Sequence, residues 1–100
     1  MENKANGGEN MKKTIITVVG KDTVGIIARV CTYLAENQIN ILDISQTIVQ
    51  GFFNMMMIVD MNQTEKKFGD IVDELVLLGK EIGVDIKCQK EEIFDQMHRI

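Results

Sequence analysis

The residues best suited to binding a small molecule lie between Gly20 and Ile27, in the segment Gly-Lys-Asp-Thr-Val-Gly-Ile-Ile. A β-branched run stops at Gly20 and an apolar pattern with helical spacing begins at Val24, which predicts a strand leading into a helix. The first N–H groups of a helix lack partners inside it and carry partial positive charge, so they can bind a small anion such as a carboxylate. Gly25, which has no Cβ, would let a ligand or another backbone approach closely.

Two interpretations of Asp22 remain open at this stage. Its carboxylate, or the hydroxyl of Thr23, can cap the helix, which is a common duty where a strand meets a helix. In that position Asp22 would compete with an anionic ligand for the same N–H groups. A zwitterionic amino acid avoids the conflict, because its carboxylate would bind the amides while its ammonium group faces Asp22.

Other side chains with reactive or metal-binding chemistry are few and scattered. Cys31 and Cys88 stand far apart, with no His or Cys at ligand spacing, which favours free thiols over a disulfide or a zinc site. The single histidine, His98, is interpreted as a solvated residue rather than a general base. The Met55–Met57 run suits an adaptable core or interface better than a metal site. We therefore predict no catalytic residue, no metal and no cofactor.

The composition indicates one globular domain. The chain has 100 residues, of which 45% are hydrophobic and 26% charged. A net charge of −4 disfavours a nucleic-acid partner. The longest wholly apolar run, Met55–Val59, is far too short to span a membrane, and we expect no signal peptide. We expect a cytoplasmic protein with neither nucleic acid nor membrane as a partner.

The elements that must position the loop follow from periodicity and from turn and cap residues. Strands are expected over Lys13–Val19, Ile39–Val49, Phe52–Met61 and Val84–Gln89. Helices are expected from Val24 to Asn37, from Thr64 to an end bracketed by Gly79 and Gly83, and from Glu91 to Ile100. Thr64 is expected to cap the second helix, and Asn37 to end the first in a left-handed conformation. The polar residues 1–11 are expected to form a disordered tail.

The strand over Ile39–Val49 has a phase problem. Ile39 and Ile41 fall on one face, whereas Leu42, Ile44 and Ile48 fall on the other. Either a bulge shifts the register or both faces of the strand are covered. The Gln-Gly pair that follows predicts a tight turn into the third strand.

The order strand, helix, strand, strand, helix, strand predicts an α+β fold of the ferredoxin-like βαββαβ type. Its four-stranded antiparallel sheet carries two helices on one face, with a short C-terminal helix added. The first and third strands, expected at the centre, are apolar on both faces. Because two helices cover only one face, the C-terminal helix or a partner subunit must cover the other.

Two segments of the chain resemble the ACT domain, a small regulatory module that binds amino acids and related metabolites. Gly20–Ala28 resembles the family's D-x-x-G-I loop, and Asn37 with Ile39–Thr47 resembles its N-I strand opening. The likeness covers residues 12–90, and residues 91–100 would form the added helix. Within the family, the chain resembles the free-standing bacterial ACT proteins, which in turn are similar to the glycine-cleavage regulator and to the front domain of formyltetrahydrofolate deformylase.

The resemblance implies a ligand held between the first loop and the second strand, often across a side-by-side homodimer. Carried over by position, the ligand-binding residues would be Asp22, Thr23, Val24, Gly25, Ile26, Asn40 and Ile41. Asn40 could equally satisfy an exposed strand end. The expected function is a non-catalytic regulatory module that binds an amino acid or related metabolite. The alternative is a module that binds no ligand and serves protein–protein interaction or dimerisation.

Overall fold

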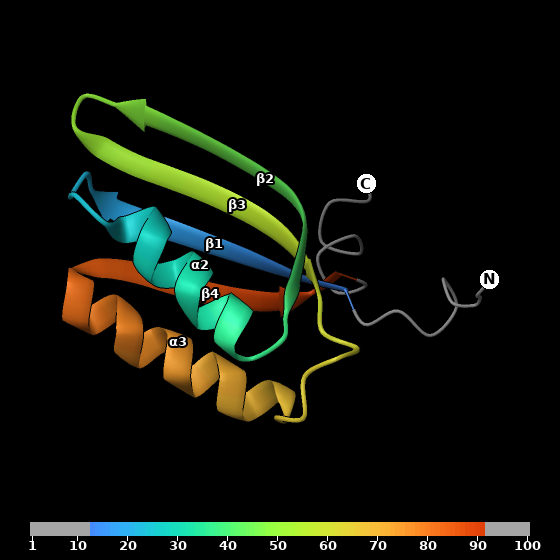
Figure 1. The fold of residues 1–100 in the computed structure, drawn as a ribbon. Coiled ribbons are helices and arrows are strands. Elements are labelled where there is room, and N and C mark those ends of the chain that lie inside the picture. Colours follow the sequence, from blue (N-terminus) through green and yellow to red (C-terminus); the bar gives the residue numbers. More distant parts are fainter. Residues whose placement is uncertain (1–12, 92–100) are drawn as a thin grey trace.

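The computed structural model describes residues 13–91 (Figure 1). The disordered tail predicted for residues 1–11 and, apart from Glu91, the helix predicted for residues 91–100 lie outside this range. The elements in chain order are β1 (Lys13–Lys21), α2 (Ile26–Glu36), β2 (Asn40–Val49), β3 (Phe52–Asp60), α3 (Phe68–Ile82) and β4 (Val84–Lys90). They confirm the predicted βαββαβ order.

All strand pairs are antiparallel, and the sheet order is β2-β3-β1-β4. The strands predicted at the centre, β1 and β3, are central, and β2 and β4 are the edges. Both helices lie on the same side of the sheet in Figure 1. We call the face under the helices the covered face and the opposite one the open face.

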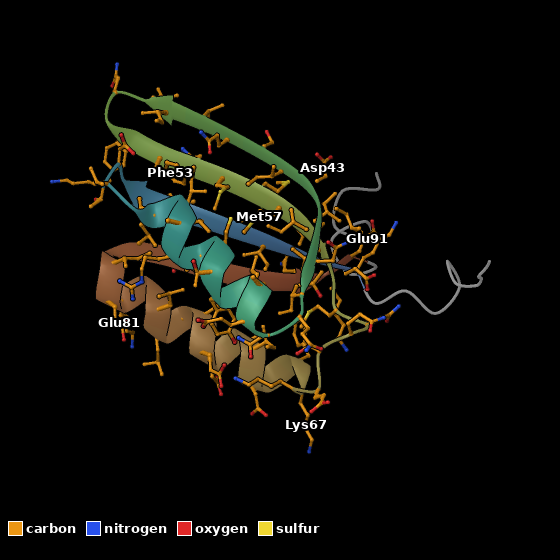
Figure 2. All side chains as sticks on the ribbon, viewed as in Figure 1. Asp43, Phe53, Met57, Lys67, Glu81 and Glu91 are labelled. Atoms are coloured by element: carbon orange, nitrogen blue, oxygen red, sulfur yellow. The ribbon has the colours of Figure 1, made fainter. Side chains whose placement is uncertain are left out.

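The core lies between the covered face and the two helices. Met57 on β3 is fully buried, and Figure 2 shows it between the sheet and α2 together with Phe53. Every second residue of a strand points to the same face. Other fully buried core side chains are Ile16, Val18, Val30, Leu34, Val59 and Leu75. On the open face, Val19, Phe52 and Met56 remain exposed.

A bulge at Leu42 resolves the phase problem of β2. Ile41 pairs with Val59, but Asp43 pairs with the adjacent Ile58, so Leu42 is the extra residue. The bulge moves the apolar positions after it onto the face that Ile41 occupies. The β2–β3 turn is as predicted, with Gln50 at φ 52° and Gly51 at φ 82°, the paired positive values of a type I′ hairpin.

Both helices start later than predicted, and the predicted N-caps are wrong. The residue before α2 is Gly25 and the residue before α3 is Lys67, and neither helix has a side-chain cap. The Thr23 hydroxyl instead donates to the carbonyl oxygen of Lys21 at 3.2 Å. The hydroxyl of Thr64 accepts a hydrogen bond from the amide of Lys66 at 3.3 Å. Both hydroxyls therefore stabilise turns that precede the helices.

The end of α2 also differs from the prediction. Asn37 is the C-cap, but its φ of −104° is not left-handed, and Gln38 at φ 60° takes that conformation instead. The Asn37 side chain donates to the carbonyl oxygen of Tyr33 at 2.9 Å, which holds it against the last turn. The following residue must then turn the chain into β2.

Polar contacts join α2 to α3. Arg29 pairs with Glu81 at 2.8 Å, and the hydroxyl of Tyr33 donates to Glu74 at 2.6 Å. Lys66 donates to the same Glu74 oxygen at 2.8 Å. The bonds from Lys66 and Tyr33 lower the pKa of Glu74, whereas burial and the neighbouring Glu74 raise the pKa of Tyr33.

Candidate functional site

The loop between β1 and α2, residues 22–25, is fixed at both ends. The amide of Asp22 donates to the carbonyl oxygen of Gly51 at 2.9 Å, which ties the loop to the β2–β3 turn. At the other end, the carbonyl oxygen of Gly25 accepts from the amide of Arg29 at 2.9 Å. Gly25 itself is left-handed, with φ 92° and ψ 0°. The loop therefore has a defined backbone although it lies at the surface.

The loop offers donors and an acceptor to a ligand. Within residues 13–91, the amides of Val24, Gly25 and Ile27 donate no hydrogen bond, and the carboxylate of Asp22 has no partner. A Cβ built on Gly25 would meet nothing within 4 Å, so the space beside it is open. No side chain makes a cap hydrogen bond to α2, so the interpretation in which Asp22 caps this helix is wrong.

A single chain does not bring all the predicted site residues together. Asp22, Thr23, Val24, Gly25 and Ile26 are contiguous at one end of the sheet. Asn40 and Ile41 open β2 at the other end, where they pair with Asp60 and Val59. The near end of β2 is Val49, which lies nine residues beyond Asn40, or about 30 Å along an extended strand. In one chain, the loop and the start of β2 are therefore two separate surfaces.

The outer edge of β2 is an exposed apolar strand. Ile44 and Ile48 lie on the covered face, since they pair with Met57 and Phe53, yet they are 42% and 53% exposed because neither helix reaches over β2. Asp43, labelled in Figure 2, is the only charged residue among the ten of this strand. Long apolar edges of this kind pair with other strands unless charge or coverage prevents it.

The other edge, β4, differs in ways that discourage pairing. It has seven residues, and its exposed positions include Asp85 and Lys87. These two side chains lie 3.9 Å apart and are mostly solvent-exposed. Charged residues on a short edge strand oppose edge-to-edge association. Of the two edges, β2 is therefore the one better suited to pairing with another strand.

The two cysteines are free thiols, as predicted. Both are half-buried, and burial raises the pKa of Cys88 to about 11. Such a thiol is protonated near neutral pH, which argues against a nucleophilic role. Over residues 13–91, no three His, Cys, Asp or Glu side chains gather as metal ligands would. No helix in the same range is long and apolar enough to cross a membrane.

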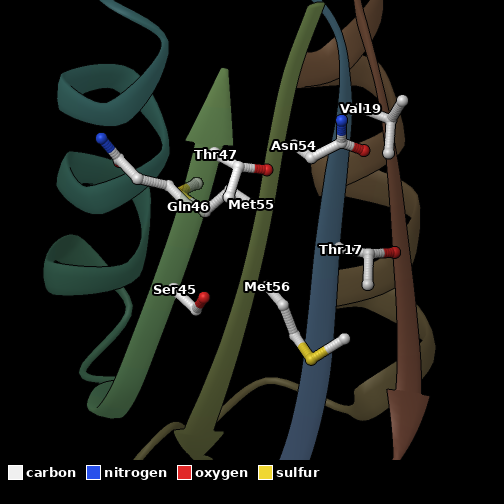
Figure 3. A pocket seen from close by; sticks show the side chains of 8 residues that line it. All are labelled: Thr17, Val19, Ser45, Gln46, Thr47, Asn54, Met55 and Met56. Atoms are coloured by element: carbon white, nitrogen blue, oxygen red, sulfur yellow. The ribbon is translucent and has the colours of Figure 1, made fainter. Parts of the chain in front are cut away.

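Sequence reasoning missed a hollow of about 220 Å³ on the open face. Figure 3 shows side chains from β1, β2 and β3 around it, including Thr17, Thr47, Asn54 and Met56. The available signal was the placing of short polar residues at every second position, at Ser45 and Thr47 on β2. It could be used only once the strand order and the bulge were known.

Comparisons with known proteins agree with this fold. A family model described as the ACT domain matches residues 12–89. A UPF0237 protein of Bifidobacterium longum is 66% identical over 90 residues, which cover 90% of this chain and all of that protein. An ACT domain protein from Streptococcus pneumoniae superposes with a TM-score of 0.75 at 41% identity, covering 85% of this chain and 96% of that one. A formyltetrahydrofolate deformylase from Pseudomonas syringae, at 19% identity and a TM-score of 0.75, covers 82% of this chain and 28% of the deformylase, and shows the fold alone.

Proposed function

Because this chain belongs to the ACT domain family, we propose that it is a homodimeric regulatory module that binds an amino acid or related metabolite and catalyses no reaction of its own. The observation that carries this proposal is the loop at residues 22–25. It combines free amide donors with a free carboxylate at the surface. A cytoplasmic location suits the free thiols.

The loop has the chemistry to recognise the backbone of an amino acid. The carboxylate of the ligand would accept hydrogen bonds from the amides of Val24 and Gly25, near the positive end of the α2 dipole. Its ammonium group would face Asp22, whose carboxylate has no partner within the described part of the chain. The two charges of the ligand are thus matched by groups of opposite sign on adjacent residues.

A homodimer through β2 would complete the site. In an antiparallel pair, opposite residues share a face. We propose that Ser45 lies opposite the partner's Ser45. Val49 lies four residues after Ser45, and Asn40 lies five residues before it. Leu42 is the unpaired bulge residue, so Asn40 is only four pairing positions before Ser45. The partner's Asn40 would therefore lie opposite Val49, next to the turn whose Gly51 binds the amide of Asp22.

The same pairing accounts for the exposed strip on β2. With the helices of both copies on the same side, the uncovered Ile44 and Ile48 would be buried against the second copy. The unpaired N–H and C=O groups of the edge would gain partners as well. The pairing would thus cover the most exposed strand of the sheet and would bring the partner's Asn40 close to the loop at residues 22–25.

A mixed-subunit experiment tests this proposal. Asp22→Asn and Asn40→Ala would each weaken ligand binding in their own homodimers. In a heterodimer of the two variants, one site carries both changes, but the other combines an intact loop with an intact Asn40. We therefore expect co-expressed heterodimers to regain half of the wild-type binding stoichiometry by isothermal titration calorimetry.

The ligand for this titration comes from a thermal-shift screen of the twenty amino acids, purines and folates. A ligand that binds only the folded state adds about 2.7 kcal/mol of stability at a hundred times its Kd. Asp85→Asn, at the exposed β4 edge, is the matched control and should bind as the wild type does. A clean monomer in light scattering, or heterodimers that bind nothing, would refute a shared site. A screen without any hit would favour the alternative, a module that binds only protein partners.

A further inference from the structure

The hollow on the open face is created by short side chains between longer ones. Two rows of paired residues cross β2, β3 and β1: Ser45, Met56 and Thr17 form one, and Thr47, Asn54 and Val19 form the next. In the first row the long side chain of Met56 stands between two short hydroxyl residues, and in the second row all three side chains are short. Neither α2 nor α3 lies over this face (Figure 1), and Figure 3 shows the side chains that line the hollow.

The polar groups in the hollow have no partners within residues 13–91. The hydroxyls of Thr17, Ser45 and Thr47 and the carboxamide of Asn54 make no hydrogen bond to any other described residue. Each hydroxyl can donate and accept, and the carboxamide adds two donors and an acceptor. On a sheet, such groups are held by the backbone of three neighbouring strands. They therefore form a hydrogen-bonding surface on a sheet whose strands fix their Cα positions.

The lining selects for an uncharged ligand. None of the side chains around the hollow is ionisable. The nearest charged side chains beyond β1 are Asp85 and Lys87 on β4, which form an ion pair at 3.9 Å. A charged ligand would therefore find no ionic partner among the lining side chains themselves. Met56 and Val19 offer apolar contact, and a methionine sulfur packs well against the edge of an aromatic ring.

The volume sets the size of the ligand. About 220 Å³ is below the roughly 300–1,000 Å³ of pockets for drug-sized molecules and equals about seven waters at bulk density. We propose that this hollow binds a neutral, hydrogen-bonding heterocycle of the size of a nucleobase. The site is separate from the loop at residues 22–25, because the sheet lies between the hollow and α2. It also stays accessible in the proposed dimer, where β2 pairs through its edge.

Methionine-methyl NMR of the full chain tests this inference, with uracil and adenine as probes. Met56 lines the hollow, whereas Met57, its neighbour in sequence, is fully buried on the covered face and serves as an internal control. We expect at least one probe to shift the Met56 methyl signal in a saturable way and to leave Met57 unchanged. Asn54→Leu, which removes the carboxamide and narrows the hollow, should weaken binding about tenfold or more.

Two controls make the result specific. Lys87→Gln, which changes a charge on the open face outside the lining, should bind the probe like the wild type. Gly25→Ala should also bind it, so failure of the loop proposal would leave this result intact. Unchanged Met56 signals with both probes at millimolar concentration would overturn the inference. A Met56 shift that depends on protein concentration alone would assign the face to self-association and overturn it as well.

Discussion

The left-handed conformation of Gly25 makes Gly25→Ala a quantitative test of the loop. A Cβ at this position would meet nothing within 4 Å, so the cost is conformational rather than steric. Placing an alanine at φ 92° costs about 1–2 kcal/mol. The lower entropy of the unfolded chain offsets about 0.4–1 kcal/mol of that cost. We expect a net loss of about 1 kcal/mol, which lowers the Tm of a domain of this size by about 4–8 °C.

Gly83→Ala is the matched control for this variant. Gly83 follows α3 with φ 82°, and a Cβ there would also meet nothing within 4 Å. The two variants should therefore lose similar stability in thermal denaturation at equal protein concentration. Only Gly25→Ala should also lose the stabilisation by ligand, because its strain changes the direction of the loop amides.

A third glycine separates strain from steric overlap. A Cβ on Gly79 would lie 2.6 Å from the carbonyl oxygen of Val84, where α3 packs on β4. Gly79→Ala should therefore be destabilised by overpacking, by about 1–3 kcal/mol. Wild-type stability in Gly25→Ala would refute the strain argument. Loss of the ligand response in Gly83→Ala as well as in Gly25→Ala would refute the placing of the site at the loop.

The remaining predictions concern the β2 edge and the contacts between the helices. Ile44→Lys places a charge on the exposed apolar edge and should give a monomer in light scattering, whereas Lys87→Gln on β4 should leave the oligomeric state unchanged. Because the folded pKa of Glu74 is lowered, its contribution is present above its ordinary value of 4.5 and is lost as pH falls through the folded pKa. In urea titrations, the stability difference between wild type and Glu74→Gln should therefore shrink in acid, and an unchanged difference would contradict the assigned contacts. The raised pKa of Tyr33 has the opposite sign, so its contribution is present below its ordinary value of 10.0 and is lost at more alkaline pH.

The sequence by itself determined the order of the elements and the topology of the sheet. Alternation in β4 and helical spacing in α2 and α3 reflect burial of one side of each element, and such patterns are local. Short connections and right-handed crossovers then leave few arrangements of six elements. The turns at the glycines of the loop and of the β2–β3 connection could also be predicted, because their positive φ angles disfavour most other residues.

Helix caps were misjudged because several residues near each start could cap equally well. Thr23 and Thr64 are good cap residues, yet their hydroxyls bind the backbone of the turns that precede the helices. Which competing hydrogen bond forms depends on where the chain leaves the strand. The course of the backbone between strand and helix is set by the packing of the helices on the sheet, so it cannot be predicted from the local sequence.

The site was only partly visible in the sequence for a related reason. The loop at residues 22–25 is contiguous, so its glycine and its carboxylate could be found from spacing alone. The separation of Asn40 from the loop follows from the antiparallel direction of β2, but the hollow at Asn54 depends on the residue register, including the bulge at Leu42. The sequence left open whether β2 contains a bulge, so the register, and with it the side chains that meet across neighbouring strands, was decided by the tertiary structure.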